Sequence, residues 1–114
     1  MSNHASRRIA QLRNLVRQGL HEENLDRLIQ ECNALAQDTP HVLLFFTLKS
    51  VFMELSAALE REPVEVSRFQ ELVGRITEQT SELLQRVEGG KPVGFGEIEE
   101  LVRTHLVSLS LFRL

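Results

Sequence analysis

Residues 38–60 read DTPHVLLFFTLKSVFMELSAALE, and apolar side chains recur in this stretch at intervals of three and four. That spacing predicts a helix, because an α-helix turns once in about 3.6 residues. Asp38, Thr39 and Pro40 favour a helix start, since Asp or Thr can cap a helix and proline is best tolerated in its first turn. We therefore expect a helix that begins at this segment and ends near Glu60.

This helix carries two apolar stripes. The broader stripe consists of Leu44, Phe45, Leu48, Val51, Phe52, Leu55 and Leu59. The second stripe consists of Val42, Phe46, Met53 and Ala57. A helix with two apolar faces either buries both in its own fold or leaves one for a partner. Two interpretations stay open: a central helix covered on both sides by its own chain, and a surface that packs on another chain, most often in a two-fold dimer.

The same periodicity predicts four further helices. We expect them over residues 6–18, over 21–37, from residue 63 or 67 to 88, and from 97 to the C-terminus. Gly19 suits the left-handed conformation that ends a helix, and the glycine-rich loop 89–96 separates the last two helices. The sequence therefore predicts an all-α, up-and-down helical bundle of four to five helices, after a flexible N-terminus of residues 1–5. We expect the last three helices to form the core and the first two to cross them as a hairpin.

Composition indicates a single soluble domain. The 114 residues suit one hydrophobic core, and the shares of apolar (42%) and charged (25%) residues are those of ordinary soluble proteins. A single cysteine, Cys32, excludes an internal disulfide and a cysteine-based zinc site. The longest unbroken apolar run, Val42 to Phe46, is much shorter than the roughly 20 residues of a membrane-spanning helix. We expect a cytoplasmic protein that needs no cofactor and binds no membrane.

The net charge of −3 is unevenly distributed, because the first 20 residues carry four arginines and no acid. Arg13 and Arg17 are the candidate contacts for nucleic acid or another anion. Projection on a helix spreads Arg7, Arg8, Arg13 and Arg17 over several sides, so no continuous basic stripe forms. A regulator that associates with nucleic acid is therefore an alternative hypothesis. The other explanation is a first helix that packs near acidic neighbours of its own fold.

Catalytic and metal-binding patterns are weak. His4, His21, His41 and His105 lack the spacing of metal ligands on a helix. Four carboxylates distantly resemble the glutamate clusters that hold magnesium in all-α nucleotide pyrophosphatases: Glu22, Asp26, Glu78 and Glu82. Helical projection places them on polar faces, which a solvated surface explains better. We expect no enzyme, and keep the pyrophosphatase-like activity as a lesser alternative.

Several residues of the last third are candidates for contacts. His105 projects into the apolar face of the last helix, which predicts a packed imidazole bonded to a backbone carbonyl or a buried hydroxyl. A polar contact in an interface and a pH-sensitive position are its alternatives. Phe95, in the glycine-rich loop, is a candidate docking contact. Near the C-terminus three apolar residues point away from the main face: Val107, Leu111 and Leu114.

These observations favour a small helical protein–protein interaction module: an adaptor, a regulator or a chaperone-like subunit. The second stripe, together with the three apolar residues near the C-terminus, is the candidate interface. We expect the protein to self-associate, most simply as a dimer, and to bind a protein partner.

Overall fold

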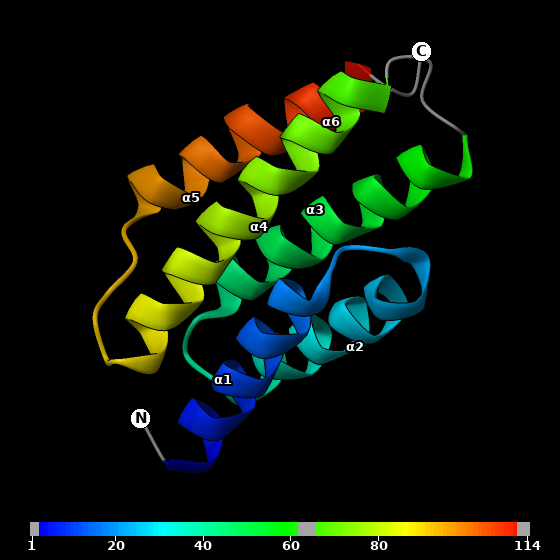
Figure 1. Ribbon diagram of the computed structural model, residues 1–114. Coiled ribbons are helices and arrows are strands. Elements are labelled where there is room, and N and C mark those ends of the chain that lie inside the picture. The colour runs from blue at the N-terminus through cyan, green and yellow to red at the C-terminus, as the bar shows by residue number, and fades with distance from the viewer. Residues whose placement is uncertain (1–2, 62–65, 112–114) are drawn as a thin grey trace.

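Five helical passes, each reversing the direction of the one before, make up the part of the chain that the structure describes (Figure 1). The computed structural model describes residues 3–61 and 66–111. In chain order the elements are α1 (Asn3–Gln18), α2 (Glu22–Asp38), α3 (Val42–Glu60), α4 (Val66–Glu88), α5 (Phe95–Leu101), the π-helical segment η1 (Val102–Leu106) and α6 (Val107–Leu111). The last three elements are continuous and form one pass. No strand occurs in the described residues, and the predicted all-α helical bundle is confirmed.

The helices form two layers. In one layer α3 lies in the middle, with α2 along one side and the α5–η1–α6 pass along the other. In the second layer α1 and α4 pack antiparallel to each other (Figure 1). The smallest dimension of the molecule is 20 Å, which matches two layers of helices about 10 Å thick. In space, α1 packs along α4, and α2 packs along α3. The first two helices therefore do not cross the others as a hairpin.

The centre of the core is the broad stripe of α3. Phe45, Leu48, Phe52 and Leu55 have no exposed surface. All five passes contribute buried apolar side chains to the same cluster, so the core is not confined to the last three helices as the sequence predicted. Burial of each large apolar side chain stabilises the fold by about 1.5–3 kcal/mol.

Helix boundaries differ from the prediction where local bonds decide them. α1 begins at Asn3, so residues 3–5 are helical and Ser6 lies inside the helix. α3 begins at Val42 rather than at the Asp-Thr-Pro segment. Thr39, which precedes Pro40, has an extended backbone (φ −129°, ψ 163°) and ends α2. Its Oγ1 donates to the carbonyl oxygen of Leu35 at 2.7 Å. Residue 63, a possible start of the fourth helix, lies outside the described residues, and α4 is described from Val66.

Two glycines adopt the left-handed backbone that other residues avoid. Gly19 has φ +137° and turns the chain from α1 into α2, as its position predicted. Gly90 has φ +80° after the end of α4. The side-chain amide of Asn24 donates to the carbonyl oxygen of Gly19 at 3.1 Å. This bond ties the turn to the first part of α2.

By length and composition alone, α3 is long and apolar enough to cross a membrane. Within its 19 residues, a window of 18 reaches a mean hydropathy of 1.8, although it includes Lys49 and Glu54. From the length of unbroken apolar runs we expected no helix long enough to span a membrane, and that criterion did not detect the high mean hydropathy of α3. A helix in the core of a soluble protein passes the same test, and 44% of the apolar stretch of α3 is buried inside the fold.

Replacement of Phe52 by alanine tests the assigned core. Phe52→Ala should lower the free energy of unfolding by about 3–5 kcal/mol, because it removes a fully buried ring and leaves a cavity. Gln85→Ala, on the exposed side of α4, should change it by less than about 0.5 kcal/mol. Urea unfolding followed by circular dichroism measures both values. Equal, small effects of the two substitutions would contradict the core assignment.

Candidate interaction surface

One side of α3 is apolar and open to solvent. We name the α3 face the stripe formed by Val42, Phe46, Ser50, Met53 and Ala57. Val42 and Phe46 are each 45% exposed, Met53 is 51% exposed, and Ala57 is half-buried. The second stripe predicted from the sequence therefore lies at the surface of this fold and is not enclosed by its own chain.

The position of α3 explains why this face is open. On the α2 side, Lys49 Nζ donates to Asn33 Oδ1 at 3.0 Å. The α5–η1–α6 pass covers the other side, and the opposite face of α3 is buried in the core. Thr47 is buried as well. Three sides of α3 are therefore covered, and the α3 face is the fourth.

A hollow extends the α3 face at its N-terminal end. The hollow has a volume of ≈ 230 Å³ and lies where α3 and α5 begin. Its lining includes Val42, Leu43, Val93 and Phe95. Leu43 is 49% exposed and Phe95 is 71% exposed. The apolar surface of α3 therefore continues onto the start of α5.

Hydrogen bonds fix the segment that presents Phe95. Arg86 on α4 donates from both terminal nitrogens to the Glu97 carboxylate, and its Nη2 also donates to the carbonyl oxygen of Pro92 at 2.9 Å. Glu97 Oε2 accepts from the backbone amide of Gly94 at 2.9 Å, which closes the first turn of α5. The bonds with Arg86, and then with Gly94, lower the pKa of Glu97. The same pair raises the pKa of Arg86. Both groups stay charged near neutral pH, so this connection persists.

His105 lies in the core and not at the surface. It belongs to η1, is fully buried, and donates from Nε2 to the side-chain oxygen of Gln79 on α4. The predicted packed imidazole is found, but its partner is a side-chain amide rather than a backbone carbonyl or a hydroxyl. Its Nδ1 has no hydrogen-bond partner among the described residues. Burial, and to a lesser degree the charge of Arg75, lower the pKa of His105.

This lowered pKa predicts a loss of stability in mild acid. The folded state keeps His105 neutral, whereas the unfolded chain binds a proton below pH about 6.5. The free energy of unfolding should therefore fall as the pH drops from 7.5 to 5.5. In His105→Gln this fall should be smaller, because the titrating group is gone. Urea unfolding of both proteins at the two pH values measures the difference. An equal fall in both would show that His105 does not titrate differently on folding.

Cys32 is not a reactive site. It is fully buried on α2, and burial raises the pKa of its thiol far above the ordinary value. A thiolate is the reactive form of cysteine, so the folded protein holds this group in its inert form.

Cys32 should consequently react with a disulfide-exchange reagent only when the chain unfolds. We expect less than about 1% of the rate of a free cysteine in buffer, since the folded form excludes the reagent. In denaturing urea the rate should reach that of a free cysteine. Absorbance of the released thiol follows both reactions. Rapid labelling of the folded protein would mean that α2 opens far more readily than its packing indicates.

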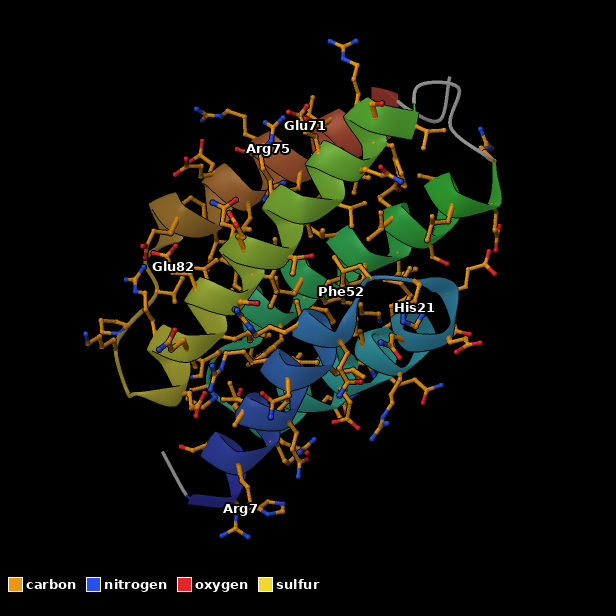
Figure 2. All side chains as sticks on the ribbon, viewed as in Figure 1. Arg7, His21, Phe52, Glu71, Arg75 and Glu82 are labelled. Atoms are coloured by element: carbon orange, nitrogen blue, oxygen red, sulfur yellow. The ribbon has the colours of Figure 1, made fainter. Side chains whose placement is uncertain are left out.

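The arginines of α1 are partly occupied by acids of the same chain. Arg8 Nη1 lies 2.8 Å from Asp38 Oδ2, and Arg13 Nη2 lies 3.0 Å from Glu88 Oε2. Arg17 is exposed, and Arg7 points outward at the N-terminal end of the helix (Figure 2). Of the two candidate contacts for nucleic acid, one is thus in an ion pair. This geometry agrees with a basic helix that packs near acids of its own fold.

The four candidate carboxylates do not meet in a cleft. Glu22 and Asp26 are exposed on α2, while Glu78 and Glu82 are exposed on α4. Figure 2 shows Glu82 on the outer side of α4, along with Glu71 and Arg75. Within residues 3–61 and 66–111, no three His, Cys, Asp or Glu side chains are arranged to hold a metal ion. The magnesium site that a pyrophosphatase-like activity requires is therefore not formed by these residues.

The candidates near the C-terminus are only partly described. Val107 is 53% exposed on α6. Leu111 is the last residue of α6, and Leu114 lies outside the described residues.

Comparison of the chain with protein families, curated proteins and solved structures finds no match. A functional hypothesis therefore depends on the geometry of the surface.

Sequence reasoning missed one part of this surface. Leu43 was assigned to neither stripe, yet it lies beside Phe95 in the hollow. Its position on a helical wheel, 100° from Val42, falls at the edge of the second stripe. A helical wheel describes one helix at a time. It therefore does not show that the α5–η1–α6 pass lies beside α3 and brings Phe95 next to Leu43.

Proposed function

We propose that this protein is a small helical interaction module, an adaptor, regulator or chaperone-like subunit, that binds another protein chain through the α3 face and Phe95. The observation that carries the proposal is the half exposure of Phe46 and Met53 on the most apolar helix of the fold. Both side chains lie away from the core cluster. Their apolar character is therefore not required by the packing of this chain.

The size of the surface supports this proposal. Side chains of this kind offer about 150–250 Å² each when fully exposed, so the exposed parts of Val42, Leu43, Phe46, Met53 and Phe95 amount to roughly 500 Å². That area lies at the upper end of the largest apolar patch found on ordinary monomers, and such patches commonly mark contacts with other proteins.

The surroundings of the surface also resemble those of a protein interface, with an apolar centre and a polar rim. Lys49 lies at the α2 edge, with Nζ 5.8 Å from the centre of the Phe46 ring. Ser50 lies within the stripe, and its hydroxyl donates to the carbonyl oxygen of Phe46 at 3.1 Å. Lys49 and Ser50 each make a hydrogen bond inside the chain, so neither side chain depends on a partner protein for its first polar contact.

A charged substitution tests the proposal. Phe46→Glu should abolish the protein contact, because it places a carboxylate in the apolar centre. It should preserve the helical circular dichroism spectrum, since Phe46 is outside the core. Val66→Glu is the matched control, because Val66 is exposed on α4 and lies outside the α3 face. A photoreactive phenylalanine analogue at position 46, activated in living cells, reports the contact directly, with the analogue at position 85 as its control.

Protein adducts at position 46 but not at position 85 would support the proposed function. Loss of the adducts at position 46 when Met53→Glu is also present would support it as well. Two results would contradict it. One is a lack of adducts at position 46 above the level at position 85. The other is binding of the folded protein to phospholipid vesicles that Phe46→Glu abolishes, because the α3 face would then contact lipid.

A further inference from the structure

We propose that the chain that covers the α3 face is a second copy of this protein, packed antiparallel about a two-fold axis that passes between Lys49 and Ser50. This inference rests on the proposed function, and it names the partner and the register of the contact. Four properties of the surface carry it: the order of residues along the stripe, the distribution of bulk, the charge at its ends, and its area.

The order of residues makes the stripe self-complementary. In an antiparallel pair of identical helices, two residues lie opposite each other when their numbers have a constant sum. With the axis between residues 49 and 50, Phe46 lies opposite the partner's Met53, and Val42 lies opposite the partner's Ala57. The four apolar members of the stripe thus meet one another, and Ser50 lies opposite the partner's Lys49. The large side chains at positions 46 and 53 flank the axis, where they are most fully removed from water.

The distribution of bulk favours the antiparallel over the parallel arrangement. The N-terminal end of the surface is bulky, because Leu43 and Phe95 lie beside Val42 around the hollow. The C-terminal end is small, because Ser56 and Ala57 occupy it. An antiparallel pair places each bulky end on a small end. A parallel pair would oppose two bulky ends and leave a gap between the small ends, at a loss of packing.

Charge supports the same orientation. Glu60 is exposed at the C-terminal end of α3, and in the antiparallel register it lies beside the N-terminus of the partner's α3. A carboxylate there is favoured by the unpaired backbone amides and the helix dipole. Lys49, near the axis, is drawn toward α2 by its hydrogen bond to Asn33. This bond holds each ammonium on the α2 side of the Phe46 ring, 5.8 Å from its centre.

The area matches what a stable pair needs. Two copies of the surface would bury on the order of 1,000 Å² of apolar area. A standard interface buries about 1,600 Å² in total, of which somewhat more than half is apolar. The polar edges contributed by α2 and by the α5–η1–α6 pass supply the remainder. The α3 face is thus large enough to be the centre of a dimer interface.

Single cysteines test the register. When Val42→Cys and Ala57→Cys proteins are mixed and oxidised, we expect a covalent dimer that contains one of each. Neither variant alone should cross-link, because two copies of residue 42 lie about 22 Å apart along the antiparallel helices. Gln85→Cys, on the exposed side of α4, is the control for random collisions. Cys32 is buried and does not compete. Non-reducing electrophoresis identifies the products.

Light scattering of the purified wild-type protein completes the test. The proposal expects a mass of twice 13.0 kDa, reduced to one chain by Phe46→Glu and unchanged by Val66→Glu. Cross-linking of Val42→Cys with itself would overturn the antiparallel register. A monomeric mass without mixed cross-links would overturn the second copy as the partner. If position 46 then still forms adducts with a different protein in cells, the proposed function stands; if it forms none, both proposals fail.

Discussion

The position of α3 between two neighbours in a three-helix layer is the constraint on which the rest of the structure depends. A helix there contacts α2 on one side, the α5–η1–α6 pass on the other, and the second layer across its buried face. In a fold of two layers, none of the elements described within residues 3–61 and 66–111 covers its outer side. The broad stripe of α3 therefore organises the core, while the α3 face is open by geometry.

The charged groups are arranged around this constraint. The ion pair between Arg13 and Glu88 joins α1 to α4 within the second layer, and Arg8 joins α1 to the end of α2. Arg86 and Glu97 join α4 to α5. Arg7 on α1 and Glu71, Arg75 and Glu82 on α4 are exposed (Figure 2). These charges lie on the second layer and along the edges between helices, so a partner at the α3 face need not desolvate them.

Local sequence signals predicted most of the secondary structure, because helix periodicity and the turn at Gly19 depend on neighbouring residues alone. The same signals predicted both stripes of α3. They did not predict that α1 packs along α4, since apolar faces specify burial but not the neighbour. For the same reason the place of Leu43 in the hollow was missed. His105 was correctly placed inward, yet its partner Gln79 is 26 residues away and only the fold brings the two together.

The apolar character of the α3 face is informative because this fold does not require it. Polar side chains at positions 42, 46 and 53 would preserve the helix and the core, since none of the three belongs to the buried cluster. They would also reduce the risk of aggregation that exposed apolar surface brings. Lys49, whose stem crosses the edge of the surface to reach Asn33, shows that the chain can place charge on this side of α3. The stripe beside Lys49 is nevertheless apolar, and its bulky end fits its small end when two copies run in opposite directions. Contact with a second chain that carries the same stripe explains both properties. The stability of a monomer explains neither.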